Sequence, residues 1–153
     1  MTHYIIDGNN LIGRSKMLKE VHSKDKQRSR AELVSMLNSY FAGKKLSITL
    51  HLDGFKNLTL SLAKGKIVYS DKQSSDTKIR EEISKSRNPK LITLVSSDRP
   101  LADFARVNSC SIVKSEDFIK MMDDKKEANE EVRKISDLEN EKEFFRKIFN
   151  SNK

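Results

Sequence analysis

Tyr4-Ile5-Ile6-Asp7-Gly8-Asn9-Asn10 is the most informative stretch of the sequence. A short apolar run is followed at once by an acid, a glycine and two amides, a pattern typical of a buried strand that ends in a polar loop. Similar short apolar runs, each bounded by polar residues, occur at residues 46–52, 66–69, 91–95 and 111–113. Longer amphipathic segments separate them, so we predict an α/β fold with a mainly parallel central sheet.

Helices are predicted between these strands. The first runs from about Ser29 towards Gly43, with its apolar residues at helical spacing and a glycine where it should stop. A second is expected over residues 75–85. A third begins after Asp98-Arg99-Pro100, where proline suits a first helical turn, and a fourth begins at Ser115, a capping residue type.

The C-terminal part differs in composition from the rest. Residues 123–149 are highly charged, yet Val132, Ile135, Leu138 and Phe145 form a rough helical stripe. A break near Asn140 is an open alternative to one continuous helix. We predict one α/β domain over residues 1–122 and an appended charged helical extension over residues 123–153, because no linker or internal repeat marks a further domain.

The charge of the chain is concentrated in its first part. The sequence has 30 Lys and Arg against 22 Asp and Glu, a formal net charge of +8. Residues 1–122 hold 22 basic and 13 acidic side chains, and the remainder holds 8 and 9. The whole excess therefore belongs to the predicted α/β domain, where a positive field favours polyanions such as nucleic acid.

The single Cys110 excludes an internal disulfide and argues against a cysteine zinc site, and its apolar flanks predict a buried thiol. No basic-plus-apolar leader precedes Tyr4, and no window approaches the roughly 18 apolar residues of a membrane span. These features predict a cytoplasmic protein without a membrane partner.

Three predicted strands end in aspartate. Asp7, Asp53 and Asp98 follow them, and Asp76 lies at the start of a predicted helix. Because the carboxyl ends of parallel strands meet at one edge of a sheet, we expect these carboxylates to converge. Each one taken alone could instead be a helix cap or a turn residue, and Asp53-Gly54 is a common turn pair.

Crowded carboxylates repel each other unless protons or cations neutralise them. Oxygen ligands without thiolates favour Mg²⁺ or Mn²⁺, which can activate water and offset the charge of a reacting phosphodiester. The sequence leaves open whether one ion or two are held.

Several motifs in order resemble the YacP-like NYN domain family over about residues 3–122. They begin with Tyr4 to Gly13, which contains the Asp-Gly-x-Asn signature, and continue through Arg30, the strand ending at Asp53, and Ser74-Ser75-Asp76. The later stretches are Leu94-Val95-Ser96-Ser97-Asp98-Arg99, Ser111 to Val113, and Ser115-Glu116-Asp117-Phe118.

The resemblance implies a PIN-like three-layer α/β/α sandwich that cleaves RNA with carboxylate-bound Mg²⁺ or Mn²⁺. Asp7, Asp76 and Asp98 match its catalytic acids, and Asp53 is a supporting metal ligand. Further positions expected to support the site or bind substrate are Asn10, Arg14, Arg30, Ser97 and Arg99. Some relatives have two adjacent acids where this chain has Ser75-Asp76, which reduces the number of ligands.

A metal-dependent endoribonuclease is the first hypothesis for function. Between Arg14 and Arg30, seven basic residues stand against two acids, which favours a strip that follows the phosphates of RNA. The second hypothesis is an RNA-binding or ribosome-associated module with weak or no catalysis. The third is a receiver-like domain that holds Mg²⁺ for regulation, although no convincing phosphoacceptor arrangement accompanies it. The RNA class, the oligomeric state and the role of the C-terminal helix remain open.

Overall fold

A computed structural model describes residues 1–151 of the chain. Five parallel strands form one sheet in the order β3-β2-β1-β4-β5. Their bounds are Thr2–Asp7 for β1, Leu46–Leu52 for β2, Gly65–Tyr69 for β3, Ile92–Val95 for β4 and Ser111–Val113 for β5. The predicted α/β class with a parallel sheet is confirmed.

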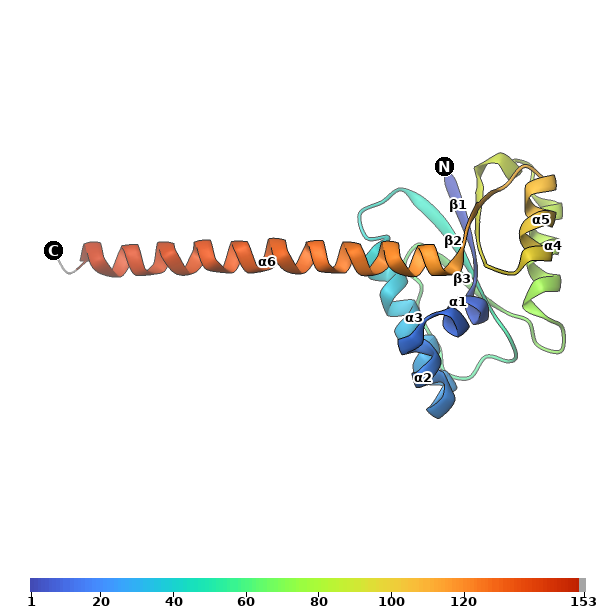
Figure 1. Cartoon of the computed structure of the whole chain (residues 1–153), viewed down its shortest axis with the longest axis horizontal. Coiled ribbons are helices and arrows are strands. Elements are labelled where there is room, and N and C mark those ends of the chain that lie inside the picture. Colours follow the sequence, from blue (N-terminus) through green and yellow to red (C-terminus); the bar gives the residue numbers. More distant parts are fainter. Residues whose placement is uncertain (152–153) are drawn as a thin grey trace. The chain divides into compact units, whose positions relative to one another are not determined.

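Helices cover both faces of the sheet, giving three layers (Figure 1). On one side lie α4 (Ser75–Lys85) and α5 (Arg99–Val107), and on the other lie α1 (Gly8–Arg14), α2 (Lys16–Lys24) and α3 (Lys26–Tyr40). A short 3-10 turn, η1 (Pro89–Leu91), precedes β4, and α6 runs from Ser115 to Ser151.

Residues 8–24 form two helices that were not predicted from the sequence. Ser15 separates the two helices. Its backbone N–H donates to the carbonyl oxygens of Leu11 and Ile12 at the end of α1, and its hydroxyl accepts a hydrogen bond from Leu18 N at 3.2 Å at the start of α2. Asp25 caps α3 in the same way, accepting from Arg28 N at 3.1 Å. Most of the predicted basic strip is therefore helical, and short helices of this kind are stabilised by packing, here of the fully buried Leu11 and Leu18, rather than by propensity.

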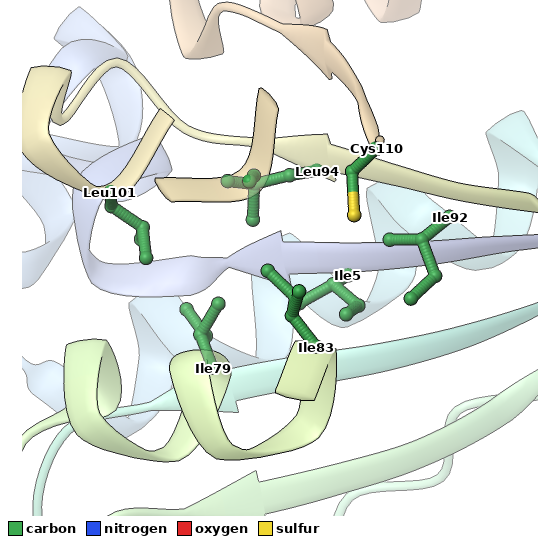
Figure 2. Packing of buried hydrophobic residues seen from close by; sticks show 8 residues of the cluster. Ile5, Ile79, Ile83, Ile92, Leu94, Leu101 and Cys110 are labelled. Carbon is green, nitrogen blue, oxygen red and sulfur yellow. The ribbon is translucent and has the colours of Figure 1, made fainter. Parts of the chain in front are cut away.

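One hydrophobic core lies between the sheet and the pair α4 and α5. Ile5 of β1 is fully buried there with Ile79 and Ile83 of α4 and Leu101 of α5, as Figure 2 shows. Cys110 belongs to this cluster, so the prediction of a buried thiol is confirmed.

Aromatic rings fill the opposite face of the sheet. The Tyr4 ring of β1 lies 4.9 Å from the Phe41 ring and 6.4 Å from the Phe118 ring, measured between centroids. Tyr40 contacts Phe41 and Phe118 edge-on. Phe41 and Phe118 are fully buried and Tyr40 is partly buried, so these rings belong to the core.

The chain divides into two compact units, Met1–Lys120 and the part that begins at Met121. Within the second unit α6 is continuous through Asn140, so the alternative of a break there is wrong. Its apolar residues Val132, Ile135 and Phe145 are each more than half exposed. Among residues 1–151, no helix is both long and apolar enough to cross a membrane.

Candidate active site

Asp7 is the last residue of β1, and its carboxylate is buried at the carboxyl edge of the sheet, 9% exposed. The Ser96 hydroxyl, at the end of β4, donates a hydrogen bond of 2.9 Å to Asp7 Oδ2. Asp98 N donates in turn to the Ser96 oxygen at 3.1 Å. This chain of bonds holds the Asp7 carboxylate in one orientation.

The surroundings of Asp7 make its negative charge costly. Burial raises the pKa of Asp7 to about 6, against the opposing effect of hydrogen bonds from Ser96 and from the backbone N–H of Asn10. The negative charges of Asp53 and Asp98 raise the pKa further. The charges of Asp53 and Asp98 therefore act on the Asp7 carboxylate at this edge of the sheet, and a shared metal site of these acids stays a prediction.

Gly8 lets the backbone at the end of β1 pack directly against β2. A Cβ atom at this position would lie 2.6 Å from the carbonyl oxygen of His51 and equally close to the Leu52 side chain. Only glycine fits the close approach, so the Asp-Gly pair sets the position of Asp7 as well as its chemistry.

Asn10 joins three elements at this edge. Its Oδ1 accepts hydrogen bonds from Ser97 N at 2.9 Å and from the Ser115 hydroxyl at 2.7 Å. The Ser97 hydroxyl accepts from Ser115 N at 2.9 Å and donates to Glu116 at 3.0 Å. Asn10 and Ser97 therefore hold the loops after β1, β4 and β5 together, which is a positioning role.

Asp53 follows β2 and is exposed. Its backbone N–H and one of its carboxylate oxygens nevertheless make hydrogen bonds within the protein. Asp53 N donates to Asn9 Oδ1 at 2.9 Å, and Asp53 Oδ1 accepts from Ser75 N at 3.1 Å, at the start of α4. Asp53 thus connects the Asp7 loop to the helix that carries Asp76.

Asp76 and Asp98 each use one carboxylate oxygen locally. Asp76 Oδ1 accepts from Arg80 Nε at 2.7 Å within α4, and Asp98 Oδ1 caps α5 by accepting from Leu101 N at 3.0 Å. Asp98 belongs to the electrostatic surroundings of Asp7, whereas Asp76 is absent from the groups that shift the Asp7 pKa. Asp76 is thus connected to the cluster through Asp53 and Ser75.

The two predicted arginines differ in their surroundings. Arg14 is exposed and lies 3.4 Å from Glu116, an ion pair that substrate could displace. Arg30 is 9% exposed, and its guanidinium donates to the carbonyl oxygens of Phe55 at 3.0 Å and Asp53 at 2.5 Å. Arg30 therefore holds the loop after β2, and its side chain points into the protein rather than into solvent.

A pocket of about 430 Å³ lies beside the Ser96 end of the cluster. Its cationic walls are Arg99, Arg106 and Lys114. Arg106 pairs with Asp103 at 3.0 Å, while Arg99 and Lys114 are exposed and make no ion pair with any described residue. The remaining lining residues are Ser96, Ser97, Ala102, Asp103 and Ile112.

The donor set partly fits a hard divalent cation. Asp53, Asp76 and Asp98 each keep one carboxylate oxygen that makes no hydrogen bond within residues 1–151. No three Asp, Glu, His or Cys side chains in this described range are positioned to hold an ion together. Mg²⁺ commonly binds one or two carboxylates and completes its shell with water and substrate phosphate, and such a site suits Asp7 with Asp53 or Asp98.

Ser96, Ser115 and Asn9 also position the site, although their sequence pattern did not predict this role. Each makes a hydrogen bond with a residue that is distant in the sequence, and Ser115 lies 105 residues from its partner Asn10. Serine at a strand end or helix start is common, so composition gave no signal. The only usable signal was that Ser96 and Ser115 fall within motifs at the ends of two predicted strands.

A parallel sheet between two layers of helices, with acids at its carboxyl edge, is the arrangement expected of the PIN-like class of α/β/α domains. Within this class, the chain belongs to the YacP-like NYN domain family, whose sequence profile matches residues 4–153. This is a family of PIN-like ribonuclease domains, and membership favours a ribonuclease over the receiver-like hypothesis.

Solved structures agree with this fold. A crystal structure of Rae1 (YacP) from Bacillus subtilis, in a tryptophan-to-leucine variant, is 16% identical with a TM-score of 0.73, covering 89% of this chain and 84% of that one. A second Rae1 structure from the same organism is 17% identical with a TM-score of 0.66, covering 89% and 82%. No curated protein matches the sequence.

Proposed function

We propose that this chain is a metal-dependent endoribonuclease that cuts RNA at the carboxylate edge of its sheet. The observation that carries the proposal is Asp7, buried beside Asp53 and Asp98 so that its pKa is raised to about 6. A fold does not need such a costly group, which is typical of a functional site. Mg²⁺ or Mn²⁺ is the proposed cofactor.

Asp7, with Asp53 or Asp98, would hold the cation. When bound, the ion lowers the pKa of an attacking water and offsets the negative charge that builds on the phosphodiester. Ser96 keeps the Asp7 carboxylate oriented through its 2.9 Å hydrogen bond. Asp76 stands outside this immediate group, and we assign it a supporting role at the same edge.

The positive groups beside the cluster would hold the RNA backbone. Arg99 and Lys114 are exposed and unpaired among the described residues, and they line the pocket next to Ser96. Replacing both with Gln should make the plot of log binding constant against log salt concentration less steep. Its negative slope should shrink in magnitude by about 1.4 for single-stranded RNA, since each phosphate contact contributes about 0.7. Fluorescence anisotropy of labelled RNA over a salt series measures the slope, and an unchanged slope would contradict this assignment.

Cleavage is tested with end-labelled structured and single-stranded RNA in Mn²⁺ or Mg²⁺. Asp7→Asn should lower the rate about a hundredfold or more, because one ligand and its charge are lost. Glu81→Gln, which removes an exposed acid on α4 away from the cluster, is the matched control and should cut as the wild type does. Activity that survives both EDTA and Asp7→Asn would overturn the proposal.

The second candidate is an RNA-binding or ribosome-associated module with weak or no cleavage. It is favoured by Ser75, which stands where some relatives carry a second acid, and by the lack of a ready three-ligand site within residues 1–151. Metal-dependent binding of intact RNA by the wild type would support it over the nuclease. A cytoplasmic location is part of both proposals.

A further inference from the structure

The loop after β2 has a fixed backbone at the site edge. Gly54 adopts a positive φ of 84°, its N–H donates to the Ser70 hydroxyl at 3.0 Å, and its carbonyl accepts from Asp71 N at 2.8 Å. Arg30 holds the carbonyls on either side, those of Asp53 and Phe55. Three successive residues are thus immobilised by groups from α3 and from the turn after β3.

The side chain that this rigid turn presents is aromatic and largely in water. Phe55 is 60% exposed, and its ring contacts no other ring in the described part of the chain. Lys56 beside it is also exposed and makes no ion pair with a described residue. A single exposed apolar side chain is ordinary, but one on a backbone tied at three successive residues has lost the freedom that would let it fold back onto the surface.

Phe55 also lies next to the proposed chemistry. It follows Asp53 by two residues, so their Cα atoms are separated by no more than about 7 Å. Asp53 is one of the two acids that act on the buried Asp7. Along the sheet edge, β2 and its loop lie on the opposite side of β1 from β4 and the Arg99 pocket. An RNA strand crossing Asp7 from that pocket would reach the Phe55 loop.

We propose that Phe55 is a stacking platform for an unpaired base of the RNA, with Lys56 contacting the adjoining phosphate. This inference rests on the proposed function and deepens it by naming the substrate class, which is single-stranded RNA. An exposed ring stacks on any base, so the platform selects unpaired over paired nucleotides without reading sequence. A rigid platform loses little conformational entropy when the base binds.

The absence of tryptophan from the chain makes a direct test possible. In an Asp7→Asn background, which keeps RNA intact, Phe55→Trp gives a protein with one tryptophan at the proposed platform. Single-stranded oligoadenylate should quench its emission in a saturable way, whereas a blunt duplex should quench it far less. Leu58→Trp is the matched control, since Leu58 is 62% exposed in the same loop but its N–H and carbonyl make no hydrogen bond with another described residue. Equal quenching at both positions would overturn the stacking role.

Binding measurements separate this inference from the proposed function. Phe55→Ala should weaken binding of single-stranded RNA about tenfold or more, and Phe55→Tyr should restore it, with thermal stability unchanged in both. If the wild type binds and cleaves RNA but Phe55→Ala does so equally well, the platform is wrong and the nuclease stands. If the wild type neither binds nor cleaves RNA, the proposed function fails and the platform fails with it.

Discussion

Asp7 has conflicting effects on stability and activity. Its folded pKa of about 6 lies above the ordinary value of 3.8, so the charged form opposes folding. The contribution of Asp7 to stability is fully present below about pH 4 and is lost as pH rises through 6. The residue proposed to be most important for cleavage is therefore one that the fold would be more stable without.

Asp7→Asn should stabilise the protein by about 1–3 kcal/mol at pH 7.5, because it removes the buried charge and keeps an acceptor for Ser96. Thermal unfolding in EDTA at pH 4 and pH 7.5 measures the effect. The gain should be large at the higher pH and nearly absent at the lower one. A destabilised Asp7→Asn protein at pH 7.5 would show that the carboxylate is not strained.

Glu82 is the opposite case, a partly buried acid whose charged form the fold stabilises. Burial raises its pKa, but hydrogen bonds from His3 at 2.8 Å and His51 at 2.7 Å, together with the charge of His51 and a bond from Thr49, outweigh burial and lower the pKa to about 2. This network joins α4 to β1 and β2 beneath the site.

Glu82→Gln should destabilise the fold by about 2–3 kcal/mol at neutral pH, with Glu81→Gln as the exposed neighbour control. Because the folded pKa is depressed, the stability from Glu82 is present above about pH 4.5 and is lost as pH falls towards 2. Urea unfolding from pH 7 down to pH 3 should show the difference between wild type and Glu82→Gln shrinking. A difference that stays constant across this range would contradict the assignment.

At the scale of elements, α3 fixes the loop that carries Asp53 and Phe55. Arg30 of α3 donates to two carbonyl oxygens of that loop, and its guanidinium lies 5.4 Å from the centre of the Tyr69 ring. A helix residue predicted to touch phosphate thus joins α3 to the loop after β2 and to β3. The geometry of the site edge depends on this contact between elements.

Arg30→Ala should cost about 2–4 kcal/mol, since two hydrogen bonds from a charged, buried group are lost. Arg28→Ala, an exposed arginine on the same helix, should cost little. Arg30→Lys should recover only part of the lost stability, because a lysine ammonium group cannot reproduce the geometry of the planar guanidinium group that donates to both carbonyl oxygens. Denaturant unfolding measures all three, and equal losses for Arg28→Ala and Arg30→Ala would contradict a structural role.

At the scale of the whole molecule, charge and core are distributed unevenly. Nearly all the buried apolar residues lie in Met1–Lys120, while the second unit has exposed apolar side chains and near-balanced charge. The proposed catalytic and RNA-holding groups all lie in the first unit. The first unit therefore has what a folded, RNA-binding domain requires.

A chain truncated after Met122 should keep one cooperative unfolding transition and its affinity for single-stranded RNA within about threefold, because the positive excess remains. Circular dichroism should show the loss of only the helical signal of residues 123–151. Calorimetry and anisotropy measure the two properties. Loss of RNA binding with the fold intact would show that the second unit takes part in binding.

Local sequence patterns were enough to predict the strands, the parallel sheet and the edge to which Asp7, Asp53 and Asp98 belong, because alternating short and amphipathic segments and polar strand ends are local features. They could not determine which groups fix those acids. The bond from Ser96 to Asp7 spans 89 residues, and the role of Arg30 depends on a loop 23 to 25 residues further on. Only strand order, register and helix packing bring such partners within hydrogen-bond distance. Tertiary contacts therefore settle which of the predicted residues are held by hydrogen bonds at this edge and which stay exposed.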